Sequence, residues 1–89
     1  MKVSDQFIMR TIAGENILIP VGDAAISGKG LIIFSESGAF IYQKLKDGYT
    51  REEIVEALTA EYEVSADKVS KDVDAFLNQM RQLKMLAED

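Results

Sequence analysis

The sequence contains neither cysteine nor histidine. Without cysteine the chain cannot form a disulfide framework, and without either residue it lacks the commonest sets of zinc ligands. The two absences also remove the usual neutral-pH general base and the thiol nucleophile, and no motif supports a serine–lysine pair in their place. We therefore expect a protein that is not an enzyme and that needs no metal ion or other cofactor.

Long apolar runs and an excess of positive charge are missing as well. No stretch approaches the ~20 apolar residues of a membrane span, and no signal-peptide pattern opens the chain, so we expect a cytoplasmic protein without a membrane partner. Fifteen acidic and ten basic residues give a net charge of −5. Residues 35–63 alone carry seven acidic and three basic residues. Such a surface is a poor partner for nucleic acid, because that binding relies on neutralising phosphates.

The first third of the chain predicts three strands. Three segments are rich in the β-branched and aromatic side chains that favour strands: residues 7–13, 16–21 and 31–34. The first two strands are joined at Gly14-Glu15, which predicts a hairpin, and Pro20 predicts an edge or irregular position in its second strand. Residues 22–30 hold three glycines whose spacing matches no phosphate-binding motif, so this segment is expected to be a loop.

The rest of the chain predicts three helices. Ser35 is the expected N-cap of the first, which ends near Gly48, and Thr50 with Glu53 forms a capping box for the second. Ser65 caps the third helix, which we expect to run to about residue 86. Its apolar stripe comprises Val69, Val73, Phe76, Leu77, Met80, Leu83 and Leu86.

Length and element order together predict the fold class. With 89 residues, the chain is expected to be a single domain spanning residues 1–89. Three strands and then three helices, all joined by short links, predict an α+β fold: a three-stranded antiparallel sheet followed by three helices, βββααα, in a winged-helix-like arrangement.

The third predicted strand, residues 31–34, is apolar on both faces. Leu31 and Ile33 point to one side and Ile32 and Phe34 to the other. The edge of this strand has little protection against pairing, since it has no proline and its only nearby charge is Lys29. An unprotected edge suits the addition of a peptide strand. Burial of both faces under helices and a loop is the alternative, and the sequence does not decide which face meets the core.

The order and spacing of several short segments resemble the PqqD family, whose members are also called RiPP recognition elements. The resemblance runs from about residue 7 to residue 86 and is carried mainly by Gly14-Glu15, Pro20-Val21-Gly22, Gly30-Leu31-Ile32, Ser37-Gly38-Ala39-Phe40-Ile41-Tyr42, Asp47-Gly48-Tyr49-Thr50 and Tyr62-Glu63-Val64-Ser65. Tyr42 stands where Trp is common in the family. Lys84-Met85-Leu86 replaces a frequent Gly-Leu-Leu ending, which predicts a slightly longer last helix.

The resemblance implies a non-catalytic peptide chaperone. Such modules bind the leader segment of a ribosomally made precursor peptide and present it to a modifying enzyme. In the founding case, pyrroloquinoline quinone biosynthesis, this is a radical S-adenosylmethionine (radical SAM) enzyme; related peptide pathways are the alternative. The leader is expected to add beside the third strand, against the third helix. The residues expected to bind it are Gly30, Leu31, Ile32, Ile33, Phe34, Val69, Asp72, Val73, Phe76, Leu77 and Met80.

Two further readings of the same pattern stay open. A winged-helix DNA-binding protein would use the third helix for recognition, although its four basic residues face three acidic ones. A homodimer could form if the exposed strand edge paired with a second copy, and this would be compatible with peptide binding. Within the third helix, one shoulder of the stripe is expected to reach a ligand. Asp72 is either a partner for a basic peptide residue or an ordinary exposed carboxylate.

Overall fold

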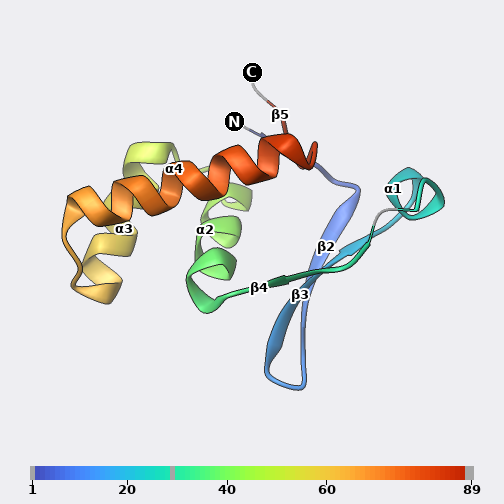
Figure 1. Cartoon of the computed structure of the whole chain (residues 1–89), viewed down its shortest axis with the longest axis horizontal. Helices are drawn as coiled ribbons and strands as arrows, with labels where there is room; N and C mark the ends of the chain where they lie inside the picture. Colours follow the sequence, from blue (N-terminus) through green and yellow to red (C-terminus); the bar gives the residue numbers. More distant parts are fainter. Residues whose placement is uncertain (1, 29, 88–89) are drawn as a thin grey trace.

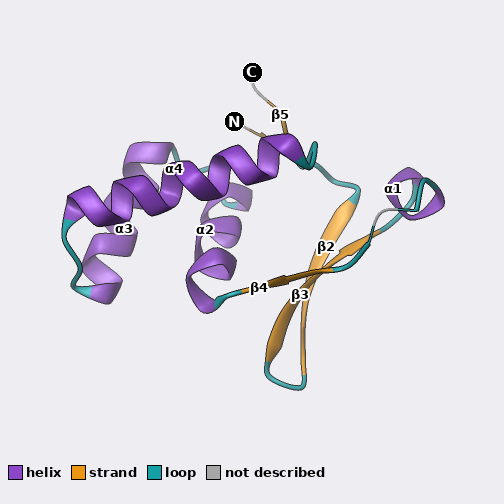
Figure 2. Cartoon of the chain, in the orientation of Figure 1, coloured by secondary structure: helices purple, strands orange, loops and turns teal. Residues whose placement is uncertain are grey.

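The computed structural model describes residues 2–28 and 30–87, so Lys29 lies outside the described residues. Three antiparallel strands followed by three long helices confirm the predicted α+β fold (Figures 1 and 2). The elements are β1 (Lys2–Val3), β2 (Phe7–Ile12), β3 (Glu15–Pro20), α1 (Asp23–Ile26), β4 (Ile32–Phe34), α2 (Glu36–Lys46), α3 (Arg51–Tyr62), α4 (Ala66–Gln82) and β5 (Leu86–Ala87).

The main sheet has the strand order β2-β3-β4. The β2–β3 hairpin extends away from the helices in Figure 1 and turns at Ala13 and Gly14, both with positive φ angles. Two consecutive residues with positive φ angles fit a type I′ turn. Since these are Ala13 and Gly14, the loop of the hairpin begins one residue earlier than the expected Gly14. Although β3 is central, only Asn16–Leu18 pairs with β4. Pro20 is the last residue of β3 and lies beyond the stretch that pairs with β4. Its missing N–H therefore removes no hydrogen bond between β3 and β4.

The core lies between one face of this sheet and the three long helices. Leu18 is fully buried on the sheet, and Tyr42, Ile54 and Val73 are fully buried on α2, α3 and α4 respectively. Ile32 of β4 is partly buried against this core. The buried apolar residues therefore come from the sheet and from all three long helices.

The helix starts are those that the sequence predicts. Ser35, Thr50 and Ser65 are the N-caps of α2, α3 and α4, and each side-chain oxygen accepts a hydrogen bond from a backbone N–H in the first turn. The capping box of α3 is complete, with the Glu53 carboxylate accepting from the Thr50 N–H at 2.9 Å. Gly48, with φ 90°, follows the end of α2, as expected.

Two expectations were wrong. The segment 22–30 contains the short helix α1 rather than only a loop. The last long helix ends at Gln82 instead of continuing to residue 86, because Lys84 adopts a left-handed conformation with φ 59° and reverses the chain. This reversal buries Met85 and Leu86, and it lets β5 pair with β1 in a small second sheet that brings the two ends of the chain together.

An ion pair joins α3 to α4. The Arg51 guanidinium donates to both carboxylate oxygens of Asp74, at 2.7 and 2.9 Å, and also to the Ser70 hydroxyl. These hydrogen bonds hold the pKa of Asp74 below its ordinary value of 3.8. A carboxylate whose pKa is lower in the folded state stabilises the fold above its unfolded-state pKa and loses that effect as the pH falls through the folded value.

We expect Asp74→Asn to lower the melting temperature at neutral pH, because it removes the charge partner of Arg51. As the pH falls through the lowered pKa of Asp74, the wild-type carboxylate also becomes protonated, so the two melting temperatures should converge at that acidic end. Thermal unfolding followed by circular dichroism from neutral pH down to strongly acidic pH measures this. Asp72→Asn, which removes an exposed pair with Lys68, is the control and should have little effect. A constant difference at all pH values would contradict the assignment.

The Tyr42 hydroxyl is the buried side-chain polar atom without a hydrogen-bond partner among the described residues. Burial also raises the pKa of Tyr42. A buried hydroxyl without a partner costs about 1–3 kcal/mol, so Tyr42→Phe should raise the free energy of unfolding by about 1 kcal/mol. Urea denaturation measures the change. Tyr62→Phe, which removes a hydroxyl from a partly exposed ring, should be neutral; a loss of stability in Tyr42→Phe would show that the hydroxyl is satisfied.

Candidate functional site

The strand β4 forms one edge of the main sheet. One side of its main chain pairs with β3, and no other described strand pairs with its second side. In Figure 1 the strand leads directly into α2, and α4 runs above both of them in the view. Unpaired N–H and C=O groups on an edge strand can bind a further strand. Main-chain hydrogen-bonding capacity is therefore exposed on β4.

The two faces of β4 have different environments. Ile32 and Phe34 are partly buried and pack on the core, whereas Leu31, which precedes the strand, and Ile33 are 64% and 63% exposed. The ring centroid of Phe34 lies 5.6 Å from that of Tyr42 and 5.5 Å from that of Phe76. The structure thus decides which face meets the core, and it leaves the Ile33 face exposed instead of burying both.

A small hollow lies beside the N-terminal end of β4. It has a volume of about 200 Å³ and is mostly apolar. The residues before and within β4 form one side, and the turn after α4 forms another. Its lining residues are Phe7, Gly30, Leu31, Ile32, Leu83 and Met85. This hollow could accept an apolar side chain of a strand placed along the edge of β4.

A second hollow, of about 260 Å³, lies beyond the C-terminal end of β4. Here the start of α2 meets the exposed shoulder of α4. The lining residues are Ser35, Ser37, Gly38, Ile41, Leu58, Asp72, Ala75, Phe76 and Gln79. A Cβ atom at Gly38 would lie 3.4 Å from the Phe76 ring, an ordinary van der Waals distance, so the start of α2 lies close to α4 here. We name the two hollows and the β4 edge between them the β4 groove.

The predicted site residues fall into two groups. The first group lies along the β4 groove. Its hollows are lined by Gly30, Leu31, Ile32, Asp72 and Phe76, and the strand itself contains Ile33 and Phe34. The other four α4 residues are core residues, each at most 3% exposed, and do not line the groove surface: Val69, Val73, Leu77 and Met80.

Sequence reasoning did not choose between the two shoulders of α4. In the structure, Asp72, Phe76, Gln79 and Leu83 face the groove. Their spacing of three or four residues marks one helix face, but nothing in the spacing says that this face points to β4. Ala75 and Gln79, which line the second hollow, were not among the predicted residues and carry no distinctive sequence signal.

The charges of the groove are sparse. Asp72 is exposed, and its carboxylate lies 3.5 Å from the Lys68 ammonium, a weak surface pair. Within residues 2–28 and 30–87 no cluster of acidic side chains is arranged to hold a metal ion, and no helix is long and apolar enough to cross a membrane. The groove therefore offers main-chain groups and apolar hollows more than charged or metal chemistry.

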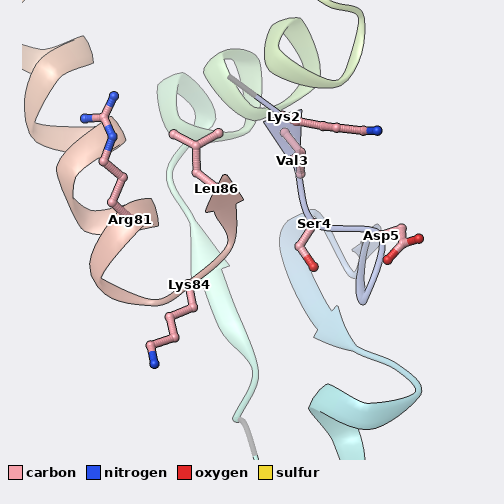
Figure 3. A pocket seen from close by; sticks show the side chains of 7 residues that line it. All are labelled: Lys2, Val3, Ser4, Asp5, Arg81, Lys84 and Leu86. Atoms are coloured by element: carbon pink, nitrogen blue, oxygen red, sulfur yellow. The ribbon is translucent and has the colours of Figure 1, made fainter. Parts of the chain in front are cut away.

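A larger cavity of about 520 Å³ lies at the β1–β5 end of the molecule (Figure 3). Its charged side chains diverge: Lys2 points to one side, and Arg81 and Lys84 leave the end of α4 in different directions. Charged groups that diverge do not enclose a small ligand as a binding or catalytic site does. We therefore regard the β4 groove as the candidate site.

The fold and the groove define a winged-helix-like domain with an unpaired sheet edge beside apolar hollows. Residues 24–86 match the family model described as Coenzyme PQQ synthesis protein D (PqqD), and the chain belongs to this family. No curated protein sequence matches it. Two solved structures are similar over nearly their whole length. One is TbiB1 in complex with the TbiA(beta) leader peptide, with 28% identity, a TM-score of 0.81 and complete coverage of both chains.

The other is lasso peptide synthetase B1 complexed with the leader peptide. It is 21% identical with a TM-score of 0.82, and the alignment covers 98% of this chain and 96% of that one. At this identity the likeness shows the fold.

A charge introduced on one face of β4 should affect stability differently from a charge introduced on the other face. Ile33→Lys should leave the melting temperature nearly unchanged, because the side chain is 63% exposed. Ile32→Lys should lower it strongly, because an unpaired ammonium would lie against the core. Thermal unfolding of the two variants makes the comparison. Equal destabilisation would show that both faces are buried.

Proposed function

We propose that this protein is a RiPP recognition element that binds the leader segment of a ribosomally made precursor peptide. The observation that carries the proposal is the unpaired edge of β4 with an apolar hollow at each end. The family membership supports it, as does the likeness to TbiB1, a structure that contains a leader peptide. The peptide is the partner of this domain, and the domain itself performs no catalysis.

The peptide binds by strand addition. Its main chain hydrogen-bonds to the free side of β4 and extends the three-stranded sheet to four strands. Main-chain bonds supply affinity for any extended peptide, and the hollows supply selectivity for particular side chains. Phe76 and Leu83 present apolar surface from α4, so we expect the peptide to carry apolar side chains at alternate positions.

Holding a leader matters only if a modifying enzyme then acts on the rest of the precursor. We propose that the domain, as a single unit of residues 1–89 in the cytoplasm, presents the precursor to such an enzyme, of the radical SAM type or of a related peptide-maturation pathway. The exposed side chains of Leu31 and Ile33 lie on the sheet face away from the core. This surface could be covered by the enzyme or by a second copy of the chain.

DNA binding is not favoured. The helix α4 carries three acidic residues beside its three basic ones, and Lys68 pairs with Asp72. It therefore lacks the excess of positive charge that a recognition helix needs to contact phosphates. The net charge of −5 further opposes approach to a nucleic acid.

Peptide binding can be tested by titrating isotope-labelled protein with synthetic peptides that cover the precursor encoded beside the gene. We expect backbone amide shifts at residues 30–34 and on the groove face of α4. Ala75→Trp should weaken binding by about tenfold or more, because it fills a hollow that otherwise buries an apolar side chain worth ~1.5 kcal/mol.

Ala60→Trp is the matched control, because Ala60 is exposed on α3 and lines neither hollow. It should leave both the affinity and the melting temperature unchanged. Shifts confined to other surfaces, or no binding of any encoded peptide, would overturn the proposal.

A further inference from the structure

A third hollow lies between α3 and the start of α4, away from the β4 groove. It has a volume of about 340 Å³ and is mostly apolar. Its lining residues are Arg51, Glu52, Val55, Glu56, Thr59 and Ala66, and none of them lines either hollow of the β4 groove. We name it the α3 hollow. In the view of Figure 1, α2 stands between α3 and the main sheet, so a partner seated on α3 leaves the β4 edge free.

The hydrogen-bonding groups of the α3 hollow are already used within the chain. The Thr59 hydroxyl donates to the Val55 carbonyl at 2.7 Å, and the Arg51 guanidinium donates to the Asp74 carboxylate. Val55 and Thr59 are half-buried, and Ala66 is exposed. The hollow therefore offers an apolar contact surface to a side chain from outside.

Two exposed carboxylates border this apolar surface. Glu52 and Glu56 lie four residues apart on one face of α3, a spacing at which like charges destabilise a helix. The helix dipole favours Glu52 in the first turn and gives no such support to Glu56 one turn later. Arg51 lies 3.7 Å from Glu52, whereas no ion pair among the described residues includes Glu56. A cation placed between the two carboxylates would relieve their repulsion.

The charge of this rim decides between occupants. A two-fold dimer formed through the α3 hollow would bring the acidic rim against its own copy. Nucleic acid and anionic lipid would be repelled in the same way. The rim instead fits a polypeptide segment that carries an apolar side chain with a Lys or Arg beside it. Because the leader peptide is expected in the β4 groove, the partner left to bind at the same time is the modifying enzyme.

We propose that the α3 hollow is the docking surface for the modifying enzyme. The enzyme inserts an apolar side chain into the hollow and places a Lys or Arg between Glu52 and Glu56. This rests on the proposed presentation of the precursor and names the surface that presentation uses. Since the α3 hollow and the β4 groove share no residue, the domain binds the leader and the enzyme together.

The affinity of the modifying enzyme encoded beside the gene tests the proposal, measured by biolayer interferometry on the full chain with the leader peptide at saturation. Glu56→Lys should weaken enzyme binding by about tenfold or more, because it opposes like charges. Its melting temperature should not fall, since the introduced ammonium can pair with Glu52. Glu61→Lys makes the same charge change on α3 outside the hollow and should leave the affinity unchanged.

Ala66→Trp tests the apolar contact. Ala66 is exposed at the start of α4, so the indole ring fills the hollow without entering the core. The affinity for the enzyme should fall by about tenfold, the loss expected when one apolar side chain can no longer be buried. The affinity for the leader, titrated on the same variants, should not change.

Equal weakening by Glu56→Lys and Glu61→Lys would reduce the effect to overall charge and overturn the inference. Loss of enzyme binding in Ile33→Lys alone would place the enzyme on the sheet face, and a dimer that Ala66→Trp dissociates would assign the hollow to a second copy. Either result, or no enzyme binding at all, overturns the inference. The leader titration is read separately, so leader binding stands unless the peptide itself fails to bind.

Discussion

The packing of Phe34 between Tyr42 and Phe76 is the contact on which the groove depends. Strand β4 has only three residues and a single strand partner, so its ladder alone would hold it weakly. The two aromatic contacts fix its inward face to α2 and α4. They also set the separation between the strand edge and the shoulder of α4, and with it the width of the β4 groove. An edge kept rigid but unpaired can accept a peptide strand without first reorganising.

The helix α4 serves the core and the groove with neighbouring faces. Val69, Val73, Leu77 and Met80 fill the interior, while Asp72, Phe76 and Gln79 line the groove beside them. Because the two sets interleave along one helix, a substitution in the buried stripe disturbs the core and the adjoining groove together. A substitution on the exposed shoulder changes the groove with little effect on the core. The division explains how so small a domain can keep apolar hollows open beside its core.

Much of the fold was predictable because its signals are local. The N-caps Ser35, Thr50 and Ser65, the left-handed Gly48 and the alternation within the strands each depend on a few adjacent residues. The short helix α1 and the end of α4 were not predictable in this way. At the end of α4, the local signal favours a continuing helix, and the chain turns at Lys84 because burial of Met85 and Leu86 outweighs the strain of one left-handed residue.

The sequence by itself determined the order of the three main-sheet strands and the three long helices, the starts of those helices, the family resemblance and the apolar character of residues 31–34. Only the tertiary structure decided that Ile32 and Phe34 face inward, that Leu31 and Ile33 stay exposed, and that the Asp72 shoulder of α4 borders the groove. The reason is that periodicity fixes which side chains share a face of a strand or helix, whereas the direction of that face depends on contacts between segments distant in the chain. The groove exists only where such segments meet.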